Sequence, residues 1–119
     1  MTLIFPFPPS LHRAYITRKG SYKRIRTDVA KNYIEIVQWT VSEARVKKPY
    51  PFVSLLQLRF YWPDNRTRDY DNHAYLIMNA LKGTLLEDDS WKNIGEKSLK
   101  SCGIDKDNPR VEVDYVVGI

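Results

Sequence analysis

The strongest periodic pattern in the chain runs from Thr27 to Lys47, where apolar residues recur every three or four positions. That spacing puts them on one side of an α-helix, so we predict a helix over residues 27–47 with a buried apolar face. Thr27 is suited to cap the N-terminus, and the prolines at 49 and 51 prevent the helix from continuing. The apolar positions are Val29, Tyr33, Ile36, Val37, Trp39, Thr40, Val41 and Ala44.

Four other segments carry the pattern of β-strands. Thr2–Phe7 is followed by two prolines, which stop the pairing of strands. Phe52–Trp62 is apolar on both faces, so we predict a central strand that is covered on both sides, with Trp62 in the core. Arg110–Val117 alternates apolar and charged residues, as expected of a strand with one solvated face. Trp91–Lys100 is predicted as a further strand.

A second helix is predicted to begin at Asp69 or Asp71 and to end near Gly83, where glycine suits a helix C-terminus. Leu11–Arg26 has no sustained period, so we expect a long loop with a short hairpin around Gly20. The resulting order of elements is β-α-β-α-β-β. We therefore predict an α+β fold, in which a mixed β-sheet of about four strands is packed by two helices in a single compact domain over residues 1–119.

Composition narrows the setting in which the protein works. The 119 residues suffice for one domain, and no apolar run approaches the roughly 18 residues needed to span a membrane. Cys102 is the only cysteine, so an intrachain disulfide is impossible and a reducing compartment is expected. We therefore predict a cytoplasmic protein with no membrane association.

The net charge of +5 is unevenly distributed. Between residues 13 and 26 there is no acidic residue, and Tyr15 and Tyr22 lie among the cations. Such a loop suits a phosphate backbone with unstacked bases beside it, and it is equally typical of a solvated loop with ordinary charge. The positive residues of the segment are Arg13, Arg18, Lys19, Lys23, Arg24 and Arg26.

Two acidic clusters flank the second predicted helix. Asp69 and Asp71 precede it, and Asp88 and Asp89 follow it. Carboxylates are hard oxygen ligands that suit Mg²⁺ or Mn²⁺, whereas no set of His and Cys residues has zinc spacing. The chain can fold back after the helix and bring the two clusters together. The alternative is a pair of helix caps and an acidic turn, and spacing alone leaves both interpretations open.

Basic residues beside a metal site indicate phosphodiester cleavage, because the metal polarises the phosphate and activates water. Arg66 and Arg68 are placed to bind the scissile phosphate or its neighbours. The two histidines, His12 and His73, stand apart in the sequence, and His73 is expected on the helix surface rather than as a ligand.

Several short motifs follow one another along the chain. They are Pro8-Pro9-Ser10, Pro63-Asp64, Arg66, Arg68, Asp69-Tyr70-Asp71-Asn72, Ala80-Leu81-Lys82-Gly83 and Glu87-Asp88-Asp89-Ser90. In these motifs, and in length and element order, the chain resembles the RusA-type Holliday junction resolvases, the crossover junction endodeoxyribonucleases of bacteria and their prophages.

The resemblance implies a function and a site. It makes Asp69, Asp71 and Asp89 the carboxylates that bind Mg²⁺, with Mn²⁺ as a substitute, and gives Asp88 a supporting role. It implies a homodimer that binds four-way DNA junctions and resolves them by paired symmetric nicks, in DNA recombination and repair. The basic loop 13–26 would contact the junction backbone, and no cofactor beyond the metal is expected. The setting would be a bacterial or phage-infected cell.

Two positions depart from the family pattern. Tyr75 stands where the family usually has a lysine needed for cleavage, and Asn79 stands where it usually has an aspartate. Our hypothesis is that Lys82 or Arg68 supplies the missing cation, which makes Lys82 a candidate catalytic residue. The departures keep two other functions open: a nuclease for flaps or other branched DNA, and a catalytically silent protein that binds junctions.

Overall fold

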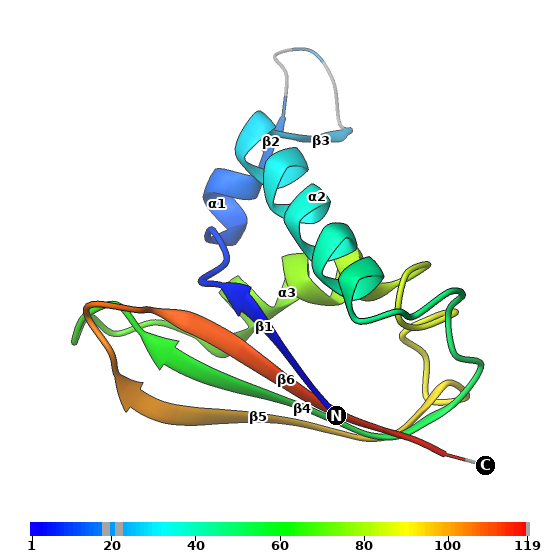
Figure 1. The fold of residues 1–119 in the computed structure, drawn as a ribbon. Coiled ribbons are helices and arrows are strands. Elements are labelled where there is room, and N and C mark those ends of the chain that lie inside the picture. The colour runs from blue at the N-terminus through cyan, green and yellow to red at the C-terminus, as the bar shows by residue number, and fades with distance from the viewer. Residues whose placement is uncertain (18–19, 21–22, 119) are drawn as a thin grey trace.

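A mixed four-stranded sheet lies under the helices, which are gathered on one of its faces (Figure 1). This computed structural model describes residues 1–17, 20 and 23–118. The strand order is β1-β6-β4-β5, in which β4 and β5 run parallel and the other neighbours antiparallel. The strands are β1 (Thr2–Pro6), β4 (Val53–Trp62), β5 (Ile94–Ile104) and β6 (Arg110–Val117). The predicted α+β fold is confirmed, and β5 runs past Lys100, the predicted end of that strand, to Ile104.

Helix α2 (Asp28–Glu43) begins where it was predicted, because the Thr27 hydroxyl accepts a hydrogen bond from the Ala30 N–H at 3.2 Å. Its buried residues are Ala30, Tyr33, Val37 and Val41. The expectation that Trp39 lies in the core is wrong: it is 66% exposed, and Val29 and Ile36 are also exposed. The helix therefore packs on its neighbours along a narrower face than the periodic pattern of apolar residues predicted.

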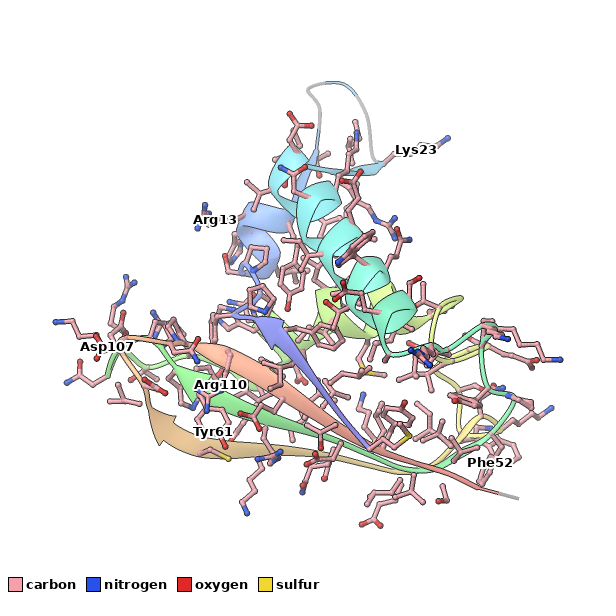
Figure 2. All side chains as sticks on the ribbon, viewed as in Figure 1. Arg13, Lys23, Phe52, Tyr61, Asp107 and Arg110 are labelled. Carbon is pink, nitrogen blue, oxygen red and sulfur yellow. The ribbon has the colours of Figure 1, made fainter. Side chains whose placement is uncertain are left out.

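Strand β4 is central, as predicted, but helices cover only one face of the sheet (Figure 1). The prediction of cover on both sides is therefore wrong. On the opposite face, Arg59 of β4 forms ion pairs with Asp114 and Glu112 of β6, at 2.6 and 3.0 Å. Beside them, the Arg110 guanidinium lies over the Tyr61 ring, 3.8 Å from its centroid; both residues are labelled in Figure 2. Charged side chains that pair with one another thus take the place of a second helical layer.

Helix α3 (Tyr70–Leu81) is buried on most sides. Its apolar residues Ala74, Ile77, Met78 and Leu81 are all buried. His73 is buried as well, so its expected place on the surface is wrong: Nδ1 lies 3.2 Å from the Pro8 carbonyl oxygen. Burial lowers the pKa of His73, which favours the neutral imidazole, and an N–H at Nδ1 then donates to that carbonyl.

The segment between β1 and α2 has more structure than a loop. It contains a short helix, α1 (Leu11–Ala14), and a two-stranded antiparallel sheet of β2 (Tyr15–Thr17) and β3 (Arg24–Arg26). The described residues therefore form three helices rather than two, and the hairpin expected around Gly20 is confirmed. Figure 1 shows this hairpin projecting away from the main sheet. None of the helices in the described ranges is long and apolar enough to cross a membrane.

The ion pair between Arg59 and Asp114 predicts how stability changes with pH. Hydrogen bonding from Arg59 lowers the pKa of Asp114, so its stabilising effect is complete above about pH 5 and is lost as the pH falls through that lowered pKa. We expect Asp114→Asn to cost about 1 kcal/mol of unfolding free energy at neutral pH, and less at about pH 3. Urea unfolding at both pH values measures this, with Glu96→Gln on the exposed surface of β5 as the control. An equal loss at both pH values would contradict it.

Candidate functional site

The start of α3 presents two carboxylates to an open pocket. Asp69 is the N-cap residue and Asp71 lies in the first turn, so both stand at the N-terminal end of the helix and line the pocket. Both residues are exposed, and neither carboxylate has a hydrogen bond or ion pair with another described residue. We call this hollow the acidic pocket; its lining residues are Leu11, His12, Asp69, Tyr70, Asp71, Asn72, Tyr75 and Leu99.

A second pocket adjoins it and carries the opposite charge. We call it the basic pocket, because Arg13, Arg66 and Arg68 are among its lining residues. Asn72 lines both pockets and therefore marks the boundary between them. A polyanion that crosses this boundary would meet cations on one side and two carboxylates on the other.

The three arginines are held to different degrees. Arg68 is mostly buried and donates two hydrogen bonds to Asp64, at 2.6 and 3.0 Å. These bonds, together with one from the Arg66 backbone N–H, hold the pKa of Asp64 well below its usual range. Arg68 therefore shapes the loop, while the side chains of Arg66 and Arg13 remain largely exposed to a ligand.

Helix α1 is fixed between the beginnings of the two larger helices. The Leu11 N–H donates to Asn72 Oδ1 of α3 at 3.3 Å. On the other side, the Thr27 hydroxyl donates to the Arg13 carbonyl oxygen at 2.6 Å, and the Thr27 N–H to that of Ala14 at 2.9 Å. The side chain of Ala14 is buried. These contacts place His12 in the acidic pocket and Arg13 in the basic pocket.

The second acidic cluster lies beyond the other end of α3. Lys82, which ends the helix, has its Nζ atom 3.5 Å from Asp88 and 3.9 Å from Asp89. The Asp89 N–H lowers the pKa of Asp88, and Lys82 lowers it further. The 12 residues of α3 separate its two ends by about 18 Å.

Two separate acidic pairs are therefore present. Across the residues that the structure describes, no group of three or more His, Cys, Asp or Glu side chains is arranged to hold one metal ion. Asp69 lies with Asp71, and Asp88 with Asp89 and Lys82. A ligand set that joins both pairs stays a prediction, as does a catalytic role for Lys82.

The chemistry of the first pair alone suits a hard divalent cation. Mg²⁺ is commonly held by one or two carboxylates, with water and substrate phosphate completing its shell. Asp69 and Asp71 meet that requirement because they are adjacent, exposed and not engaged by a cation in the described structure. These two residues fit Mg²⁺ or Mn²⁺.

The two departures from the family pattern lie together and contact the same residue. The Tyr75 ring meets the Tyr15 ring edge-on, with centroids 5.7 Å apart, and Asn79 Nδ2 donates to the Tyr15 hydroxyl at 3.0 Å. Tyr15, which the sequence placed among the residues of a nucleic-acid-binding loop, is thus partly buried against α3. Tyr75 and Asn79 attach the base of the β2–β3 hairpin to the helix that carries Asp71.

The predicted basic loop is distributed over α1 and the hairpin. Lys23, Arg24 and Arg26 are exposed on and beside β3, and Arg13 is exposed on α1. Figure 2 shows Lys23 at the hairpin and Arg13 on the outer side of α1. Arg18 and Lys19 lie outside the described residues.

Comparison with known protein families yields one match. A sequence model of the family described as endodeoxyribonuclease RusA matches residues 6–115, which include both pockets and both acidic pairs. No curated protein sequence matches the chain.

The contacts of Asp64 predict a local effect of its removal. In Asp64→Asn, the bonds from Arg68 and from the Arg66 N–H lose their charged acceptor. We expect the Arg66 amide to exchange its hydrogen faster, while the midpoint of thermal unfolding falls by a few degrees at most. Amide exchange followed by NMR measures the first effect. Asp107→Asn, in an exposed turn, is the control, and unchanged exchange at Arg66 in Asp64→Asn would contradict this reading.

Proposed function

Because the chain belongs to the RusA endodeoxyribonuclease family, we propose that it resolves Holliday junctions by metal-dependent, paired and symmetric nicks. The family implies a nuclease that acts on branched DNA. The observation that supports the finer proposal is the adjacency of the acidic and basic pockets, which share Asn72. A DNA strand laid across that boundary would bring one phosphate to Asp69 and Asp71 and its neighbour to Arg13 and Arg66.

The chemistry follows from the carboxylates at the start of α3. A Mg²⁺ or Mn²⁺ ion bound by Asp69 and Asp71 supplies polarisation of the phosphoryl oxygens and a bound water of lowered pKa. Arg13 and Arg66 attract and orient the backbone next to the scissile bond. Arg68, held by Asp64, keeps the loop before Asp69 in place. Only the resemblance to the family gives a role in this proposal to Asp88, Asp89 and Lys82.

The basic surface supports junction binding by charge. Arg13 on α1 and Lys23, Arg24 and Arg26 of the hairpin are exposed cations on a projecting part of the molecule (Figures 1 and 2). Such contacts release counterions from DNA, so junction affinity should fall steeply as salt is raised.

A homodimer would match the two-fold symmetry of a junction and supply the second active site that paired nicks need. The exposed side of α2 supports self-association. Val29, Asn32, Ile36 and Trp39 follow one another at alternating steps of three and four residues, which is the spacing of a seam between two helices. We propose that a second copy of the chain covers this seam.

The experiment that tests the function offers the protein four substrates: mobile and static four-way junctions, a flap and linear duplex, each with Mg²⁺ and with EDTA. Mapped nicks at symmetric positions on the junctions, dependent on Mg²⁺, are the expected result. Preference for the flap would replace the proposal with a flap nuclease. Binding without cleavage would indicate a silent junction-binding protein, the outcome that Tyr75 and Asn79 keep open.

Asp71→Asn is expected to bind junctions and fail to cleave them. The substitution removes a ligand charge while it preserves shape, so cleavage should fall about a hundredfold or more. Gel-shift affinity in EDTA should equal or slightly exceed that of the wild type, because Asp71 without a metal repels phosphate. Lys48→Ala, in the loop after α2, is the control for both assays. Unchanged cleavage by Asp71→Asn would remove the metal site from the proposal.

Trp39→Lys is expected to break the dimer. The wild type should have a mass in solution of about 28 kDa, twice the 14.0 kDa of one chain. The variant should have the mass of one chain, because a charged side chain disrupts an apolar seam. Analytical ultracentrifugation measures the mass, and Lys48→Ala should remain dimeric. A variant that stays dimeric would place the interface elsewhere.

A further inference from the structure

The acidic pocket presents an electrostatic difficulty to its proposed substrate. Asp69 and Asp71 repel a phosphodiester, and a divalent cation that they held would offset only part of that repulsion. A hydrogen-bond donor on the opposite wall would offset that repulsion at the phosphate oxygens. The pocket has eight lining residues, and His12 is the one among them with ring nitrogens.

The two cations considered as substitutes for the family lysine are engaged elsewhere. Arg68 gives its guanidinium to Asp64, and Lys82 lies with Asp88 and Asp89 at the other end of α3. His12, in contrast, is exposed and makes no side-chain hydrogen bond or ion pair with any described residue. Its imidazole is free to take a ligand as its partner.

The backbone around His12 is nonetheless firmly held. Leu11 is bonded to Asn72, Arg13 to the Thr27 hydroxyl, and Ala14 is buried. The backbone of His12 is therefore fixed while its side chain has no partner among the described residues. This combination suits a side chain that contacts a bound ligand. His12 lines the acidic pocket and the next residue, Arg13, lines the basic pocket, so a strand that crosses between the two pockets would pass both residues.

We propose that His12 is a catalytic residue that donates an imidazole N–H to an oxygen of the scissile phosphodiester. This inference rests on the proposed nuclease function and adds a residue to it. Charge on the phosphoryl oxygens grows in the transition state, so the hydrogen bond strengthens there and acts mainly on the rate. His73 is a built-in contrast, because it is buried and bonded to the Pro8 carbonyl oxygen.

Cleavage kinetics of the 119-residue chain provide the first test. With Mg²⁺ and enzyme in excess over a four-way junction, the cleavage rate of His12→Ala should fall about tenfold to a hundredfold. Junction affinity in EDTA should change by less than about threefold, because one exposed contact among many phosphate contacts is lost. His12→Lys, which keeps a donor on a flexible chain, should recover most of the rate. The same assay with Lys82→Ala and with Arg68→Ala tests whether either of these cations takes this role in place of His12.

A binding measurement provides the second test and does not depend on cleavage. The chain has two histidines, so an NMR spectrum of ¹⁵N-labelled imidazoles contains two sets of signals, and His12→Ala assigns them. On addition of junction DNA with Ca²⁺ in place of Mg²⁺, the His12 signals should shift, and by more than those of His73, whose ring is buried and bonded to the Pro8 carbonyl oxygen although it lines the basic pocket.

The two tests separate the possible failures. Cleavage by His12→Ala at the wild-type rate, or a His12 signal that does not shift, would overturn the role of His12 and leave the nuclease proposal standing. A wild-type protein that cleaves no substrate would overturn the nuclease function, and a catalytic role for His12 would end with it.

Discussion

Burial of α3 is the constraint on which the rest of this structure depends. The helix packs its apolar residues between the sheet and α2, and even His73 is enclosed there with its hydrogen bond to Pro8. A helix held in this way has fixed ends. One end carries Asp69 and Asp71 into the acidic pocket, and the other leads through Lys82 to Asp88 and Asp89. The position of every carboxylate in the candidate site follows from that packing.

The charged residues of the fold divide into two groups by whether they have partners. Asp64 and Asp114 accept hydrogen bonds from arginines, which lower their pKa values and tie loops and strands together. Asp69 and Asp71 have no such partner in the described structure. A pair of adjacent carboxylates without a cation costs free energy, and a ligand that neutralises them recovers it. The contrast within one small protein is the physical basis for assigning the pair to function and the others to stability.

The hairpin and the acidic pocket are mechanically joined. Tyr15 at the base of β2 packs against Tyr75 and is hydrogen-bonded to Asn79, one and two turns along α3 from Asp71. Tyr75 and Asn79, which stand where the family usually has a lysine and an aspartate, thus attach the hairpin to α3. The hairpin in turn carries exposed cations. The DNA contact proposed for the hairpin and the chemistry proposed for Asp71 would therefore depend on one helix.

The sequence by itself determined the elements and much of their order. The local signals are the cap at Thr27, the aspartates at the start of α3, the glycine after it and the alternation of Arg110–Val117, because each depends on residues a few positions apart. The family motifs are equally local, and they identified the nuclease family that the match over residues 6–115 shows.

Only the tertiary structure showed which surfaces of the helices and strands pack against one another, because the periodicity of a sequence carries no information about packing partners. Periodicity marked one wide apolar face on α2, but the neighbours of the helix bury only part of it and leave Trp39 in solvent. Two acidic clusters close in sequence lie at opposite ends of a rigid helix, while His12, nearly sixty residues before Asp69, shares its pocket. Proximity across such separations arises from packing, so it becomes visible only when the chain is folded.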